Sequence, residues 1–406
     1  MLKAERKLID WIDSHHMTLF MVIMTALALL IRSFSLDLEL SDAQGCLLPW
    51  FDTIKEAGGL AALETQVGNY TIAYQFLIAL MTYLPFDPLR MYKYLSYIFD
   101  FAMAIGAAGF VYELNGHSSK LSAAIAYCAV LFLPSVVANS EMLAQCDSIY
   151  TCFAVYALWF LYKRHYTTSF IFLGLSFSFK LQSIFILPFF LMYYFREKKF
   201  SLLNFLWIPG MLYITSLPAL VQGRDLLDPI RIYLDQSELF DGMYINFASF
   251  WSLFTEEYYV FKNVAIVLTI AIFGMMLILL MEKHVSMAPK QCFLPLACWS
   301  VWTCVLFLPA MHERYAYMLD ILLIILTMVY HSCWGYAAIA CMISTILYGI
   351  FLNGIHIEVK YLATAYLAAY CLFTWKMLKG FRETTRCCGH TADASEVTYD
   401  SQREEC

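Results

Sequence analysis

Acidic residues gather just after the first long apolar run of the chain, at Asp37, Glu39 and Asp42. A carboxylate at the end of a membrane span lies where a lipid-linked molecule presents its head group. When such a carboxylate is partly desolvated, it can take a proton from a hydroxyl group as a general base. Any of the three residues could do this, and the alternative is an acidic loop that is only solvated.

A second polar corner separates two later apolar runs and contains Asn139, Glu141, Gln145 and Asp147. Two carboxylates and two amides so close together could orient a polar ligand. Asp147 could instead cap the helix that begins beside it. A cap alone does not require Gln145 and Asn139 nearby, so the pattern favours a ligand-binding corner.

Two further positions could bind a phosphate. Lys180 lies in an apolar stretch, where a charged side chain is costly and should face a cavity or a partner. The alternative is that its ammonium group reaches the membrane interface. Arg314 can hold a phosphate with two parallel hydrogen bonds, and His312 could add a third donor.

Other charged residues inside apolar runs need partners as well. Lys93 and Asp100 lie on one face of a helix, about two turns apart. We expect a structural pair there rather than a catalytic one, and we expect Asp320 to be paired or protonated.

The composition indicates a membrane protein. Of the 406 residues, 61% are apolar and 14% are charged, and the mean hydropathy is +0.64. Soluble domains average about 25% charged residues, so this chain could not cover a water-soluble surface. The net charge of −6 includes no basic domain, which argues against a nucleic-acid partner. The 13 cysteines show no CxxC pair and no zinc-type spacing, so we expect no metal and no cofactor.

About twelve segments have the apolar composition of membrane spans. They lie near 17–36, 93–112, 121–138, 147–162, 168–180, 183–195, 203–221, 262–281, 292–309, 315–330, 334–353 and 359–378. The stretch 168–195 could be a broken or tilted pair, because its two short halves flank Lys180. Residues 1–382 form the membrane domain in this reading, and the polar segment 383–406 is expected to be a disordered cytoplasmic tail.

Lysine and arginine are concentrated in alternate connecting segments, such as Arg196–Lys199. The positive-inside rule places these segments in the cytoplasm, together with both termini. Two large acidic segments, 37–92 and 222–261, are then external. This topology requires that 71–85 does not cross, so we predict an outer-face helix that lies on or dips into the bilayer. An external Arg314 runs against the charge rule, which favours a functional role for it.

Five ordered motifs along residues 40–320 carry a resemblance to a known family. They are Ser41-Asp42 through Leu48-Pro49-Trp50-Phe51-Asp52, Gly68-Asn69-Tyr70-Thr71 with Tyr74, Gln145-Cys146-Asp147-Ser148-Ile149-Tyr150, Ser178-Phe179-Lys180-Leu181-Gln182, and Met311-His312-Glu313-Arg314-Tyr315. Together they resemble the bacterial membrane proteins related to the second mannosyltransferase of GPI-anchor assembly (the PIG-V type), within the GT-C superfamily. The chain departs from that pattern at Ala43, where an aromatic residue is usual, and at Leu143-Ala144, where Trp-Gly is common.

The resemblance implies an all-α, multi-pass protein of the cell membrane. We expect a GT-C-like bundle of about twelve transmembrane helices with juxtamembrane helices in the first external segment. Such a protein transfers a hexose, mannose or glucose, from a polyprenyl-phosphate donor to an acceptor glycan or lipid. No divalent ion is required, because the phosphate is already attached to the lipid and leaves without a nucleotide.

The resemblance also assigns roles to residues. Asp42 corresponds to the general base, and Asp147 to the acidic residue of the next outer corner. Lys180, Arg314 and His312 would hold the donor phosphate and stabilise its leaving charge. The expected substrate contacts are Trp50, Asp52, Asn69, Tyr70, Tyr74, Gln145, Gln182 and Glu313. The alternative function is a membrane transporter or lipid flippase that uses the intramembrane charged residues.

Overall fold

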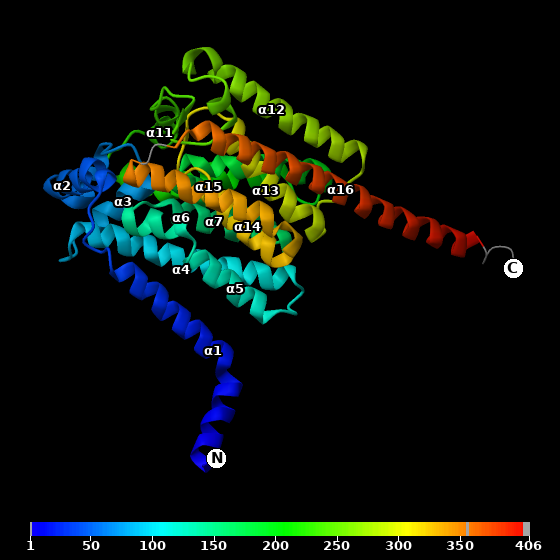
Figure 1. Ribbon diagram of the computed structural model, residues 1–406. Helices are drawn as coiled ribbons and strands as arrows, with labels where there is room; N and C mark the ends of the chain where they lie inside the picture. The colour runs from blue at the N-terminus through cyan, green and yellow to red at the C-terminus, as the bar shows by residue number, and fades with distance from the viewer. Residues whose placement is uncertain (1, 355–356, 401–406) are drawn as a thin grey trace. The chain divides into compact units, whose positions relative to one another are not determined.

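The computed structural model describes residues 2–354 and 357–400, and these residues are mainly helical (Figure 1). The chain divides into two compact units. The first contains Met1–Ser183, Phe205–Leu239 and Thr327–Trp334, and the second contains Ile184–Asn204, Phe240–Leu326 and Gly335–Cys406.

The first unit is built around a row of packed helices. Its elements are α1 (Lys3–Ser33), η1 (Ala43–Leu47), α2 (Leu48–Glu56), η2 (Gly59–Glu64), α3 (Ile72–Met81), α4 (Pro88–Leu114), α5 (Lys120–Leu131), α6 (Pro134–Val137), η3 (Ala138–Met142), α7 (Asp147–Tyr162), α8 (Tyr166–Phe179), α10 (Trp207–Val221) and α11 (Asp228–Ser237). Helix α4 packs against α5 and α7, α7 packs against α8, and α8 packs against α10. A Cβ atom on Gly109 would lie 2.4 Å from the Trp159 ring, so the glycine allows α7 to approach α4 closely.

Local sequence explains where the long helix α4 begins. Asp87 is its N-cap, and its carboxylate accepts a hydrogen bond of 2.9 Å from the backbone N–H of Arg90. Pro88 occupies the first helical position, where its fixed φ suits the helix and its missing N–H is not needed.

The second unit is centred on α13. Its elements are η4 (Leu181–Ile186), α9 (Leu187–Glu197), η5 (Leu202–Leu206), β1 (Tyr244–Ile245), η6 (Phe250–Leu253), α12 (Tyr258–Glu282), α13 (Lys290–Phe307), β2 (Met311–His312), α14 (Tyr317–Val329), α15 (Trp334–Asn353) and α16 (Val359–Asp400), of which η4, η5, α14 and α15 lie partly in the first unit. The short η7 (His331–Cys333) belongs to the first unit. Helix α13 is buried over nearly its whole length and packs against α9, α12 and α16. The short strands β1 and β2 pair in parallel, with Ile245 opposite His312.

The long apolar helices agree with a multi-pass membrane protein. Six helical segments are long and apolar enough to cross a bilayer, namely α1, α4, Leu202–Val221, α12, α13 and His331–Asn353. The bent pair Lys120–Leu131 and Pro134–Met142 would add a seventh. All twelve predicted segments coincide with helices, but several of these helices are short. Helix α8, for example, has 14 residues and is about 21 Å long, against the roughly 30 Å of a bilayer core.

Two predictions about irregular segments can be compared with the structure. The stretch 168–195 is broken at Lys180, where α8 ends and the backbone becomes extended. The segment 71–85 contains only the ten-residue helix α3, about 15 Å long, which is half of what a span needs. The prediction of a disordered tail at 383–406 stays a prediction; helix α16 is continuous to Asp400. Residues 401–406 lie outside the described part of the chain.

The predicted pairing of Lys93 with Asp100 is wrong. Asp100 is fully buried and forms an ion pair of 2.9 Å with Arg32, near the end of α1. The Lys93 ammonium instead donates to the backbone carbonyls of Ser35 and Leu38, 2.9 Å in the case of Leu38. Carbonyls after a helix end need donors, and Lys93 supplies them. Asp320 is fully buried in α14.

Candidate functional site

Two π-helical segments border the candidate site in the first unit. The first, η1, directly follows Asp42, and the second, η3, contains Asn139 and Glu141. Wide helical turns of this kind are rare and are often found at functional sites. Each one turns a polar side chain away from the regular helical spacing, which is why hydrophobic periodicity did not indicate where these side chains meet.

Asp42 is the one of the three candidate bases that contacts the second polar corner. Its side chain is half-buried, and its Oδ2 accepts a hydrogen bond of 2.7 Å from Nε2 of Gln145. Asp37 is exposed and pairs with Arg90 at 2.7 Å, and Glu39 is exposed. The geometry therefore separates Asp42 from its two neighbours in the sequence.

Gln145 is buried and fixed on both sides of its amide. The Tyr70 hydroxyl donates to Oε1 of Gln145, while Nε2 donates to Asp42. These two partners determine which amide atom is oxygen and which is nitrogen. The backbone carbonyl of Gln145 accepts a hydrogen bond of 2.7 Å from the Ser96 hydroxyl. Preceding it, Ala144 has a φ of +53°, a left-handed conformation in which glycine is unstrained.

Asp147 and Lys180 form a buried ion pair beside this chain of hydrogen bonds. The Lys180 ammonium donates to Oδ1 of Asp147, and the side-chain amide of Asn139 donates to Oδ2 at 2.7 Å. Both carboxylate oxygens of Asp147 are thus engaged, and its exposed fraction is only 1%. This arrangement suits a residue that positions the lysine better than one that accepts a proton from a substrate.

Lys180 reaches the site because α8 stops at Phe179. Irregular backbone at membrane depth is tolerated where protein or a cavity surrounds it. Thr71 helps to hold this break, since its hydroxyl donates to the Phe179 carbonyl at 3.2 Å. The Lys180 ammonium lies 5.5 Å from the centroid of the Tyr70 ring, within the range of a cation–π interaction. Tyr70 therefore contacts both the lysine and the amide that holds Asp42.

Aromatic rings form one wall of the site. The Tyr70 ring lies 5.3 Å from Trp50 and 5.2 Å from Tyr74, in edge-to-face contacts. Gly68 makes room for Trp50, because a Cβ atom there would lie 2.5 Å from the indole ring. Burial raises the pKa of Tyr74 well above its usual value, so its phenol stays neutral and can donate a hydrogen bond.

Some predicted substrate contacts have buried polar atoms with no hydrogen-bond partner among the described residues. They are the hydroxyl of Tyr74, Oε1 of Gln182 and Oδ1 of Asn69. Buried polar atoms are normally satisfied, so each of these could accept or donate to a ligand or water. Asp52 differs from them, because it is exposed on α2.

The remaining predicted residues form a separate cluster in the second unit. His312 and Glu313 are buried, and Nδ1 of His312 lies 3.8 Å from Oε2 of Glu313. Nε of Arg314 lies 4.0 Å from Oε1 of the same glutamate. The His312 ring also packs edge-on against Phe240, with ring centroids 4.1 Å apart. The acidic Glu313 thus lies between the two predicted phosphate ligands of this unit.

Two residues near the site were missed by the reasoning from sequence. Arg224 is buried and contacts the first external segment, and Gln66 links it to Tyr70. A signal for Arg224 was present, since it is an arginine in the acidic segment 222–261 and runs against the charge rule as Arg314 does. A lone polar glutamine in a loop gives no such signal.

No known protein family matches this chain, and no functionally characterised protein matches it in sequence.

Proposed function

We propose that this chain transfers a hexose, mannose or glucose, from a polyprenyl-phosphate donor to an acceptor glycan or lipid at the external face of the cell membrane. The observation that supports the proposal most directly is the connection of Asp42 to Lys180. A half-buried carboxylate and a buried cation are joined through Gln145 and Tyr70. A base and a phosphate ligand connected within one site are what such a transfer needs.

In the proposed reaction, Asp42 acts as the general base. Its carboxylate takes the proton from an acceptor hydroxyl while the hydroxyl oxygen attacks C1 of the donor sugar. The bond between C1 and the phosphate oxygen breaks on the opposite face of the sugar, so the configuration inverts. The Gln145 amide keeps Asp42 aimed at the acceptor, and the aromatic wall of Trp50 and Tyr70 contacts the sugar.

The leaving group is a polyprenyl phosphate, which gains negative charge as the bond breaks. Lys180 is the proposed ligand of that phosphate. Arg314 and His312, in the second unit, stay predicted phosphate ligands. Asp147 holds the lysine before the donor arrives. Phosphate oxygens can share the ammonium with Asp147, because a lysine has three N–H donors.

The transporter alternative would use Asp100 and Lys180 as part of a pathway through the membrane. Asp100 is held by Arg32 and by the Ser140 hydroxyl at 2.7 Å. Lys180 is held by Asp147. Charges fixed in such pairs suit a structural role or a static site better than a path for a moving ion, and the enzyme is therefore the preferred function.

The direct test is incubation of the purified protein with polyprenyl-phosphate mannose and polyprenyl-phosphate glucose in the presence of membrane lipid and glycan extracts. We expect one donor to be converted to free polyprenyl phosphate, with the hexose recovered on an acceptor. If neither donor is consumed, and reconstituted vesicles show movement of a lipid or solute that depends on the protein, the transporter alternative replaces the proposal.

A further inference from the structure

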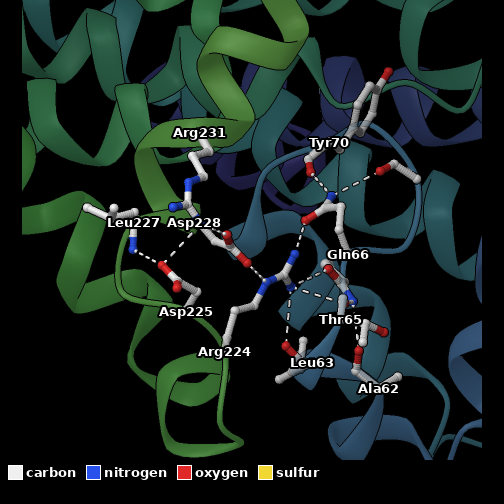
Figure 2. A network of polar contacts seen from close by, with 12 residues as sticks. Ala62, Leu63, Thr65, Gln66, Tyr70, Arg224, Asp225, Leu227, Asp228 and Arg231 are labelled. Atoms are coloured by element: carbon white, nitrogen blue, oxygen red, sulfur yellow. Dashed lines mark hydrogen bonds and ion pairs between the residues drawn. The ribbon is translucent and has the colours of Figure 1, made fainter.

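Arg224 lies at the start of the second external segment (222–261) and forms hydrogen bonds with the first external segment (37–92). Its side chain is almost completely buried, and Nη1 donates to the carbonyls of Leu63 at 3.2 Å and Thr65 at 3.1 Å, and to Oε1 of Gln75 at 3.0 Å (Figure 2). Nε donates to Asp228 at 3.3 Å. Leu63 and Thr65 precede Tyr70 and Tyr74 of the aromatic wall, and Gln75 directly follows Tyr74, so the arginine does more than stabilise α11.

Gln66 connects the Arg224 side chain to the backbone of Tyr70 through hydrogen bonds. Nη2 of Arg224 donates to Oε1 of Gln66, and this contact directs the amide nitrogen of Gln66 the other way (Figure 2). Nε2 of Gln66 then donates to the carbonyls of Gly68 at 3.0 Å and Tyr70 at 2.7 Å. Backbone carbonyls in a loop are otherwise held by water, so a single side chain fixes the tight turn that presents the Tyr70 ring.

The path continues from the backbone of Tyr70 to the proposed base. The Tyr70 hydroxyl donates to Gln145, and Gln145 donates to Asp42. The hydrogen bond from Tyr70 orients the Gln145 amide, because the amide oxygen accepts and the amide nitrogen donates. The nitrogen is thereby directed at Asp42. A second contact from α11 supports the same turn, since Nε2 of Gln236 donates to the Asn69 carbonyl at 2.6 Å.

We propose that Arg224 is a positioning residue that acts through Gln66 to hold Tyr70, and thereby keeps Gln145 directed at Asp42. The second external segment is then part of the site, although it contributes no group that touches the substrate. This inference rests on the proposed function of Asp42, and it adds that the efficiency of the base depends on residues in α11 and its preceding turn.

The sharpest variant is Gln66→Glu. A glutamate at this position still accepts from Arg224, so the anchor remains, but it has no N–H to donate to Gly68 and Tyr70. Arg224→Ala is less informative, because it removes the whole anchor and could unfold the segment. The matched control is Arg231→Ala, since Arg231 belongs to the same network but is exposed and forms ion pairs with Asp225 and Asp228.

We expect Gln66→Glu to lower kcat about 10²-fold with the donor KM unchanged, since small displacements at a site cost that much. Arg231→Ala should stay within about twofold of the parent, as surface changes do. In a Tyr70→Phe background, Gln66→Glu should cause little further loss, because both changes act through one path. Losses that simply multiply in the double variant would overturn the inference, since they would indicate a separate structural effect.

A measurement without substrate distinguishes this inference from the proposed function. Amide hydrogen exchange of residues 66–71 should be faster in Gln66→Glu than in the parent, with exchange in α11 unchanged. Unchanged exchange at 66–71 would overturn the positioning role even if the protein is an active transferase. Faster exchange in a protein that consumes neither donor would support the role of Gln66 in holding Tyr70 and reject only the transferase.

Discussion

Asp42 differs from the neighbouring carboxylates of the segment 37–92 in the residues that it contacts. Asp37 is bound to an exposed arginine and Glu39 is exposed, whereas Asp42 is half-buried against Gln145. Asp42→Asn keeps the size of the side chain but cannot take a proton as a carboxylate does. We therefore expect turnover to fall by about 10²–10⁴-fold while the donor still binds.

The matched controls for Asp42→Asn are Asp37→Asn and Glu39→Gln, which should retain most of the activity. The measurement is conversion of the donor by purified variants, with donor binding followed separately by titration. Full activity in Asp42→Asn would show that Asp42 is not the general base. Since Asp37 and Glu39 are exposed, the proposed mechanism would then lack its base.

Lys180 has to be tested together with Asp147, because the two form a buried pair. Lys180→Ala leaves an uncompensated buried carboxylate, which should lower the free energy of unfolding by about 3–5 kcal/mol. The double variant Lys180→Met with Asp147→Asn removes both charges and should recover most of that stability. Donor binding should stay weaker by about 1.5–3 kcal/mol in both variants, because the charged hydrogen bond to phosphate is missing.

Unfolding in detergent and donor titration measure the two effects separately. A double variant that is stable and binds the donor as tightly as the parent would show that Lys180 is not a phosphate ligand. The pair would then be purely structural.

Single residues show where reasoning from sequence reaches its limit. Residue type and placement identified Asp42 as a candidate base, Gln145 and Asp147 as parts of a polar corner, and Lys180 as a charge in an apolar stretch that needs a partner. The partners themselves could not be predicted. Gln145 lies 103 residues from Asp42 along the chain, and only the folded backbone brings such positions together. The failed pairing of Lys93 with Asp100 has the same cause.

At the scale of elements, apolar runs predicted the helices well. The backbone N–H and C=O groups of an apolar run in a membrane must hydrogen-bond to each other, and a helix achieves this. The predicted segment 262–281, for example, lies within α12. The short helix α11 was not predicted, since its alternating charged and apolar residues fall inside an acidic segment. The two π-helical segments were also missed, because a single extra residue per turn leaves little trace in hydrophobic spacing.

The turn before α3 provides a test of how the aromatic wall is built. Gly68 has a φ of +73°, and a Cβ atom there would lie 2.5 Å from Trp50. Gly68→Ala should therefore destabilise the protein through strained backbone, at about 1–2 kcal/mol, and should also displace Trp50 and lower transferase activity.

Gly116→Ala is the matched control, since Gly116 has a φ of +61° and no atom within 4 Å of an added Cβ. This variant should show the backbone cost alone, with activity per folded molecule unchanged. Thermal unfolding and donor turnover give the two readouts. Equal loss of activity in both variants would show that the contact between Gly68 and Trp50 does not matter for the site.

At the scale of the whole molecule, the topology depends on α3. The proposed arrangement, with both termini in the cytoplasm, requires that this ten-residue helix stays outside. Phe86 follows α3 and is 62% exposed, so a cysteine at this position should react with a membrane-impermeant maleimide in intact cells. Ser118→Cys, in the exposed turn between α4 and α5, should react only after the cells are permeabilised.

The two labelling variants are compared with the parent chain, which carries its own 13 cysteines. If the cysteine at position 86 reacts only after permeabilisation, α3 crosses the membrane or the whole orientation is reversed. A cysteine at exposed position 39, before α3, tells these two possibilities apart. It should react in intact cells if α3 crosses, and only after permeabilisation if the orientation is reversed.

The pair of Arg32 and Asp100 has a consequence for how the protein is made. Arg32 leaves the ribosome 68 residues before its partner, which at about 5–20 residues per second is a delay of roughly 3–14 seconds. During this time α1 has already emerged with a charged end, while its partner Asp100 has not yet been synthesised. Until Asp100 is present, the Arg32 guanidinium should lie near the lipid head groups, where its long side chain can reach water. The ion pair that joins α1 to α4 therefore forms only after Asp100 has been synthesised, although α1 is the first helix to emerge.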